Sequence, residues 1–188
     1  MFGKPRKEPS GDPSISELCA GLQRLGTGAQ RAERGRPEEK FTWWRGDALG
    51  VIDIPEGPIR WVTLKCDESD YSTTCYSEYG IPDPQVVPGV PKVWLMTVHL
   101  KSFPLFGKVV DLHWRGQDSK SGLIDRLMSD YSTRQAIMNS HALEIETYPS
   151  HGCWILTAWV WEAPTTELWD YYQGIARQLL ATTIPTSL

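Results

Sequence analysis

A predicted β-hairpin over residues 93–114 carries the side chains with the most distinctive chemistry. If its turn lies midway along this span, His99 faces Asp111 and Thr97 faces His113. Because side chains alternate along a strand, all of these then share one face of the hairpin. An imidazole beside a carboxylate and a second imidazole is typical of an acid/base pair or of part of a metal site.

A plainer interpretation of the same hairpin is the solvated face of a half-buried sheet, and we favour it. A slip of one residue in strand pairing would move the side chains of one strand to the other face. A metal ion needs about three protein ligands, and the spacing fixes no third one. His99, Asp111 and His113 are therefore the candidate catalytic residues of an alternative hypothesis. The other face of the hairpin would carry Trp94, Met96, Val98 and Leu100.

Tryptophan is unusually frequent, with 9 residues in a chain of 188. Trp159 and Trp161 share one face of a predicted strand, and Trp61 lies on a strand earlier in the chain. If helices cover one face of the sheet, part of this aromatic set lies on the other face. There it would bind a flat or apolar ligand, or a partner protein. The alternative is that these side chains form the core.

A long loop is predicted from residue 67 to residue 91. Loops of this length are uncommon in compact domains and are usually functional or disordered. This one combines acidic residues with tyrosines and prolines, a composition suited to partner recognition. A surface insertion without a partner is the alternative, and the acidic spacing does not match an EF-hand. The tyrosines that we expect to bind are Tyr71, Tyr76 and Tyr79.

The cysteines Cys66 and Cys75 are separated by eight residues at the start of this loop. The basic N-terminus lacks the apolar stretch of a signal peptide, so we expect a cytoplasmic location. Free thiols then follow, with a disulfide as the alternative in an oxidising compartment. No second cysteine pair has the spacing of metal ligands, and we expect no metal and no cofactor.

Composition excludes several classes of protein. Hydrophobic residues make up 40% of the chain, which is enough for a packed core. The formal net charge of −4 argues against nucleic-acid binding through phosphate contacts. The sequence contains no run of eighteen apolar residues, so no membrane-spanning helix is predicted. Phosphate loops, nucleophile elbows, zinc-protease motifs and dinucleotide fingerprints are all missing from the sequence.

The predicted elements divide the chain into an N-terminal part and a body. Residues 1–40 are expected to be a flexible tail with a short amphipathic helix at about 14–25, followed by a polar linker. Ser14 and Glu17 form a capping box at the start of this helix. Residues 41–188 are expected to be a single domain. We predict strands at 41–44, 49–54, 59–66, 91–103, 109–114, 143–148 and 153–161, and helices at 121–139 and after Pro164.

Hairpins alternating with helices predict an α+β fold. We expect a mostly antiparallel sheet packed on one face by the mid-chain helix and the long C-terminal helix. The leading functional hypothesis is non-catalytic binding of a partner protein or a small apolar or aromatic ligand. The tryptophan-bearing sheet and the 67–91 loop would form the surface. A metal-dependent or acid/base enzyme is the first alternative, and a structural homo-oligomer such as a homodimer is the second.

Overall fold

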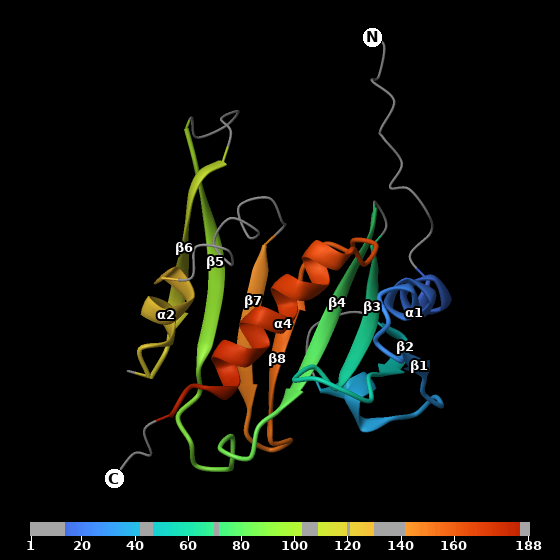
Figure 1. Cartoon of the computed structure of the whole chain (residues 1–188), viewed down its shortest axis with the longest axis horizontal. Helices are drawn as coiled ribbons and strands as arrows, with labels where there is room; N and C mark the ends of the chain where they lie inside the picture. The colour runs from blue at the N-terminus through green and yellow to red at the C-terminus, as the bar shows by residue number, and fades with distance from the viewer. Residues whose placement is uncertain are drawn as a thin grey trace.

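The computed structural model describes residues 14–41, 47–69, 72–102, 109–119, 121–129 and 142–184. These residues form an α+β fold in which one antiparallel sheet carries helices on one side (Figure 1). The expected fold class is therefore confirmed. Tyr71 and the expected flexible tail at residues 1–13 lie outside the described residues.

The described sheet has eight strands in the order β1-β2-β3-β4-β8-β7-β5-β6. The predicted strand 153–161 is apolar on both faces, and it lies between two neighbours near the centre of the sheet, as expected. The strands are β1 (Gln30–Arg31), β2 (Asp47–Asp53), β3 (Trp61–Ser69), β4 (Ser72–Pro82), β5 (Trp94–Lys101), β6 (Val109–Gln117), β7 (Leu143–Tyr148) and β8 (Cys153–Ala158).

Side-chain caps fix where two of the helices begin. The hydroxyl of Ser14 accepts a hydrogen bond from the amide of Glu17, and Thr165 does the same for Leu168. The cap at Ser14 was predicted from the sequence, as was a helix after Pro164. The helices are α1 (Ile15–Arg24), α2 (Leu123–Ser129) and α4 (Thr166–Leu180), with a 3₁₀ turn at η1 (Pro37–Lys40).

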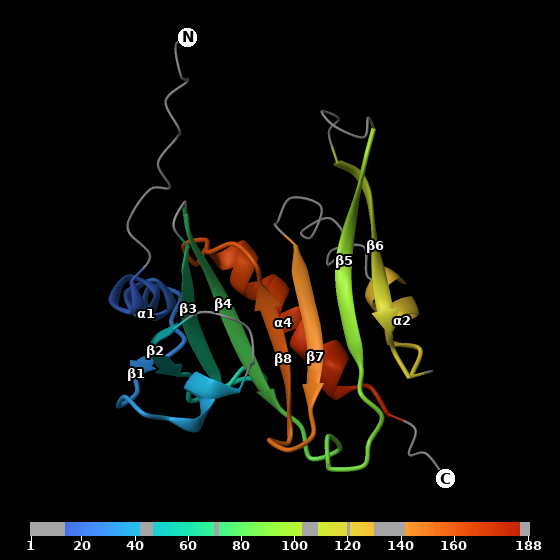
Figure 2. The same cartoon turned by 180° about the vertical axis from the view of Figure 1, so that it is seen from behind.

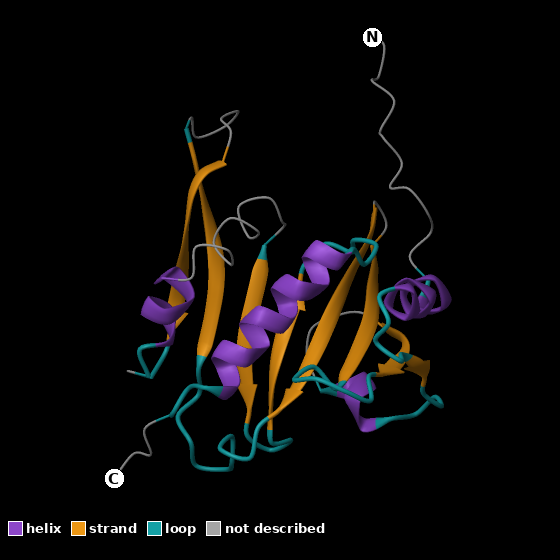
Figure 3. Cartoon of the chain, viewed as in Figure 1, coloured by secondary structure: helices purple, strands orange, loops and turns teal. Residues whose placement is uncertain are grey.

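The helices α1, α2 and α4 bury their apolar sides against the same face of the sheet, which we call the helical face. Helix α4 crosses this face diagonally (Figure 3), and from behind it is seen through the strands (Figure 2). Leu18 of α1, Leu123 of α2 and Ile175 of α4 belong to one core cluster with Leu64 and Leu156 of the sheet. Helix α1 is thus part of this core, and residues 30–31 add a strand to the sheet.

The opposite face, which we call the distal face, is partly covered by the segment that leads to Phe41. This phenylalanine packs edge-on against Trp61, with ring centroids 5.9 Å apart. Farther along the sheet, the distal face carries polar and charged side chains that are nevertheless buried. They are Thr63, Lys65, Glu78, Glu144, Glu146 and Thr157.

The structure corrects the predicted loop at residues 67–91. Strands β3 and β4 pair directly as far as Ser69 and Ser72, so most of the span is a hairpin. Cys66 and Cys75 face each other in this register, with their Cα atoms 4.1 Å apart, and form a disulfide. The expected free thiols at these positions are therefore wrong. The acidic residues and prolines of the span favoured a loop, whereas pairing with β3 stabilises residues 72–82 as a strand.

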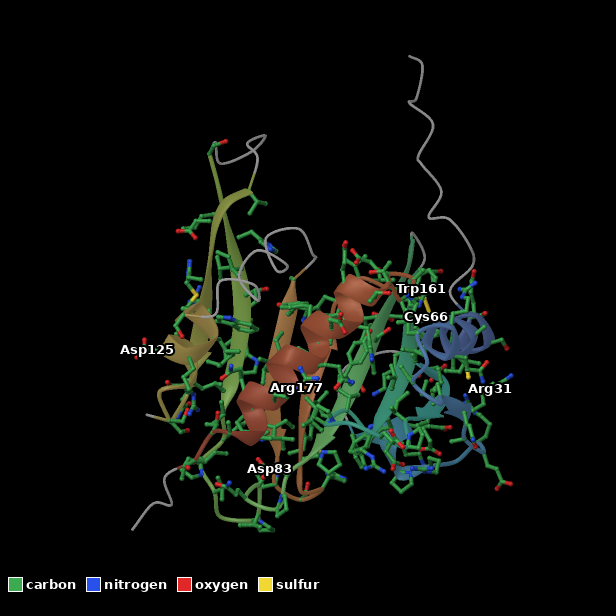
Figure 4. All side chains as sticks on the ribbon, viewed as in Figure 1. Arg31, Cys66, Asp83, Asp125, Trp161 and Arg177 are labelled. Atoms are coloured by element: carbon green, nitrogen blue, oxygen red, sulfur yellow. A yellow bond between two sulfur atoms is a disulfide. The ribbon has the colours of Figure 1, made fainter. Side chains whose placement is uncertain are left out.

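Irregular chain begins only after β4, and there too the acidic side chain is structural. Asp83 is buried, and its carboxylate accepts hydrogen bonds from the Trp154 indole at 2.8 Å and from the amide of Gln85 at 2.9 Å. Asp83 therefore anchors the turn after β4 to β8 (Figure 4).

The predicted register of the 93–114 hairpin is wrong by one residue. His99 faces Leu112, and Asp111 faces Leu100. Because residues opposite each other share a face, His99 lies on the helical face, whereas Asp111 and His113 lie on the distal face. The burial of Leu112 and Trp114 in the helical core determines this register.

A glycine in β4 makes room for the largest aromatic side chain of the distal face. Gly80 faces Trp61 in the register, and a Cβ added at Gly80 would lie 1.8 Å from the indole ring. The ring therefore lies flat across the strand where any other residue would block it. This contact explains why Trp61 is only 9% exposed.

We predict that Gly80→Ala lowers the free energy of unfolding by about 1–3 kcal/mol, because the indole of Trp61 has to move away from the new methyl group. Urea unfolding measures this loss. In a Trp61→Leu background, Gly80→Ala should lower the free energy of unfolding by less, because the indole that the new methyl group would contact is absent. An equal cost in both backgrounds would contradict the contact.

Candidate functional site

A row of buried polar side chains crosses the centre of the distal face. The register aligns Thr63 of β3 with Glu78 of β4, Glu78 with Thr157 of β8, and Thr157 with Glu144 of β7. All four side chains are less than a tenth exposed. The hydroxyl oxygen of Thr63 is buried without a hydrogen-bond partner among the described residues. A sheet face usually keeps such groups in water, so their burial needs compensation.

Lys65 and Glu78 provide part of that compensation. The ammonium of Lys65 lies 3.1 Å from a carboxylate oxygen of Glu78, and the two side chains are only 1% and 2% exposed. The two residues are diagonal neighbours in the β3–β4 pair, which brings their long side chains together. The negative charge of Glu78 is therefore balanced within the sheet.

Glu144 is held differently, between two tryptophans. One carboxylate oxygen accepts the indole N–H of Trp94 at 2.7 Å, and the other accepts that of Trp159 at 3.1 Å. Glu144 is 5% exposed. Both indoles are neutral donors, and no described lysine, arginine or histidine forms an ion pair with this carboxylate. Its charge is therefore buried without a described counter-ion.

The next acidic residue along β7 does have a counter-ion. Glu146 forms an ion pair with Lys92 and accepts a hydrogen bond from the hydroxyl of Tyr148 at 2.9 Å. Of the three buried glutamates on this face, Glu144 is thus the one whose described partners carry no charge.

This environment is visible in the pKa of Glu144. Burial raises the pKa of its carboxyl above the ordinary value, and the negative charge of Glu146 adds to that effect. The indole hydrogen bonds and the more distant Lys92 lower the pKa, but less than burial raises it. A cation placed beside Glu144 would lower the pKa of its carboxyl and so oppose the effect of burial.

Apolar side chains surround this carboxylate. Tyr76 packs on Trp159 with ring centroids 5.4 Å apart. Met96 faces Glu144 from β5 and is half-buried, as are Trp94 and Trp159. A buried negative charge with a partly exposed aromatic and thioether rim is thus the arrangement on this part of the distal face, and we call it the Glu144 site.

The predicted aromatic binding residues separate onto the two faces. Trp159 and Tyr76 belong to the Glu144 site, and Trp61 lies beneath Phe41 on the same face. Tyr79 instead packs against Tyr172 of α4, with ring centroids 4.5 Å apart.

Trp161 lies after the end of β8, where the chain bends toward the start of α4, and it packs against the helical core (Figure 4). The expected shared face of Trp159 and Trp161 is therefore wrong. The strand that would have maintained their alternation ends at Ala158.

The predicted His99, Asp111 and His113 group does not share one face, because His99 lies on the helical side of the hairpin. Within the described residues, no three His, Cys, Asp or Glu side chains are close enough to hold a metal ion. The alternative hypothesis of a catalytic or metal centre therefore lacks the geometry on which it was based.

Glu144 and Trp94 were not predicted as site residues from the sequence. One signal was present, since residues 143–148 alternate between apolar and acidic side chains in a segment predicted to be a strand. That pattern places Glu144 and Glu146 on one face. It does not show that the face is buried, or that tryptophans from β5 and from beyond β8 meet there.

No known protein family, no curated protein and no solved structure matches this chain in the comparisons. Among the described helices, none is long and apolar enough to cross a membrane. The function is therefore inferred from the chemistry of the site alone.

We predict that Lys65→Met lowers the free energy of unfolding by about 3–5 kcal/mol, because it leaves Glu78 buried without its charge partner. Urea unfolding followed by tryptophan fluorescence measures the change. Adding Glu78→Gln removes the orphaned charge, so the double variant should be more stable than Lys65→Met alone. A double variant less stable than the single one would contradict a buried ion pair.

Proposed function

We propose that this protein is a non-catalytic binding protein whose ligand places a cationic N–H group, an ammonium or a guanidinium, against Glu144. The remainder of the ligand is apolar and lies on the rim formed by Trp94, Trp159 and Met96. The ligand is either a small arylalkyl amine or a lysine or arginine side chain of a partner protein. Both sources present the same chemistry.

The observation that carries the proposal is the buried charge of Glu144. Burying a carboxylate without a counter-ion is costly, and proteins normally pair such groups or bind a cation there. The indoles of Trp94 and Trp159 hold both oxygens in fixed positions. Each oxygen accepts one of these bonds and has a further lone pair. A donor with several N–H groups matches this arrangement better than a neutral ligand does.

The aromatic rim supports the same class of ligand. Indole and phenol rings provide a large contact area at low cost in side-chain entropy, and their faces attract cations. Trp94 and Trp159 remain partly exposed beside Glu144. An apolar ligand body therefore finds contact area next to the charge.

The other sequence-based expectations do not enter this proposal. A binding role for the 67–91 span is not retained, because most of that span is paired strand. The disulfide Cys66–Cys75 favours an oxidising compartment over the expected cytoplasm, since cytosolic thiols are normally kept reduced. The other two cysteines, Cys19 and Cys153, are buried, and burial raises the pKa of the Cys153 thiol to about 12.

We predict that 2-phenylethylamine binds more tightly than 2-phenylethanol, its neutral analogue of nearly equal shape, and that Glu144→Gln removes the difference. A hydrogen bond to a charged group contributes about 1.5–3 kcal/mol, which corresponds to about 10- to 150-fold in affinity. Titration calorimetry measures both affinities. The indole N–H resonances of Trp94 and Trp159 should shift on addition of the amine.

Two further variants separate binding from folding. Trp159→Ala should weaken the binding of both compounds, because it removes apolar contact area while the helical core stays intact. Trp161→Ala should instead lower the stability of the protein, since that side chain packs against the helical core. Equal affinity of the native protein for 2-phenylethylamine and 2-phenylethanol would contradict the proposal. A preference for the amine that persists in Glu144→Gln would contradict it as well.

We predict that the affinity for 2-phenylethylamine falls as the pH is lowered, beginning at a higher pH than an ordinary glutamate would cause. The reason is that the pKa of Glu144 is raised and the protonated carboxyl offers no charge to the amine. The affinity for 2-phenylethanol should change little over the same range. Amine binding that strengthens on acidification would contradict the assignment to Glu144.

A further inference from the structure

Strand β6 forms one end of the sheet, and within the described residues no strand pairs with its outer side. An unpaired strand edge presents amide and carbonyl groups that can extend the sheet into another chain. The opposite end of the sheet is the two-residue strand β1, which is too short for such pairing. Figure 1 shows the β5–β6 hairpin rising beyond β7 at this edge.

The backbone groups that point outward from β6 can be identified. The amide of Leu112 donates to the carboxylate of Asp111 at 2.7 Å, so it takes no part in the ladder with β5. Backbone groups of an antiparallel strand point alternately to its two sides. Trp114, two residues farther on, therefore also directs its N–H and C=O groups outward.

The sequence of β6 is self-complementary about His113. In an antiparallel pair of two copies related by a two-fold axis at His113, Leu112 faces Trp114 and Asp111 faces Arg115 of the other copy. Leu112 and Trp114 then form the hydrogen-bonded pairs, with their outward groups satisfied. Asp111 and Arg115 form non-hydrogen-bonded pairs, in which side chains approach most closely. Opposite charges therefore meet twice across the axis.

Side chains next to this edge fit the same arrangement. On the distal face, Leu100 faces Asp111 within the hairpin and is 43% exposed, which is unusual for leucine in a strand. Met96 faces Arg115 in the same way. Pairing of two copies would place the Asp111–Arg115 ion pair between Leu100 of one copy and Met96 of the other. The ion pair would then be flanked by an apolar side chain on each side.

We infer that two copies of this chain associate through β6, aligned antiparallel about His113, to form one continuous sheet. The carboxylate of Asp111 then exchanges its contact with the Leu112 amide for Arg115 of the second copy. The Leu112 amide passes to the carbonyl of Trp114 of that copy. This interface does not depend on the proposed function, because β6 forms the new strand pair and the Glu144 carboxylate lies on β7, with Met96 of the rim between the two.

Charge reversal tests the register. Sedimentation of the full chain should show a dimer whose dissociation constant rises about 10- to 30-fold in Asp111→Arg and in Arg115→Asp, because like charges then face each other twice. The double variant Asp111→Arg/Arg115→Asp should dimerise as the native chain does. Arg60→Asp is the matched control, an exposed arginine away from β6, and should leave the dimer unchanged.

Crosslinking provides a second measurement that does not require the reversed variants to fold. His113→Cys should form an intermolecular disulfide between its two copies under mild oxidation, since the axis places the position opposite itself. Arg115→Cys should not, because it faces Asp111. A native chain that sediments as a monomer at millimolar concentration would overturn the inference. A dimer that is insensitive to both reversals, or equal crosslinking at both positions, would do so as well.

Discussion

The antiparallel pairing of β4 with β8 is the constraint on which the rest of the structure depends. It joins two hairpins that lie far apart in the sequence, and it fixes both faces of the sheet at once. On the helical face the register aligns Tyr79 with Leu156, which builds the core under α4. On the distal face it aligns Glu78 with Thr157, which begins the row of buried polar groups. A slip of one residue would exchange the two sets and place charges under the helix.

Burial of charge on the distal face follows from this register. Three glutamates project from the middle of a sheet whose side chains exclude water, and each needs a partner. Glu78 has Lys65 and Glu146 has Lys92, both within the same chain. Glu144 has two indoles that orient its oxygens without neutralising them. Glu144 is therefore the place where we propose that a ligand binds. A ligand cation would be stabilised most beside a buried carboxylate that has no counter-ion.

The architecture also explains why helices are confined to one side. Alternation within the strands directs large aliphatic side chains toward α1, α2 and α4, and directs the polar row away from them. On the distal face, close packing comes from flat aromatic rings lying on the strands. Trp61 crosses Gly80, and Trp159 lies beside Tyr76. On this face Trp94, Met96 and Trp159 remain partly exposed, whereas the helical face is covered by α4.

The sequence by itself determined the α+β class and most of the helices and strands. Local chemistry sufficed for the start of α1 at Ser14, for a helix after Pro164 and for an apolar strand that begins at Cys153, because caps and periodicity act over a few residues. Only the tertiary structure decided the register of the β5–β6 hairpin, the strand pairing hidden in residues 67–82 and the meeting of Trp94 and Trp159 at Glu144. The register and the strand pairing depend on which side chains become buried and which strands pair, and Trp94 and Trp159 reach Glu144 from 50 and 15 positions away. A local pattern contains no information about which distant side chain provides the partner.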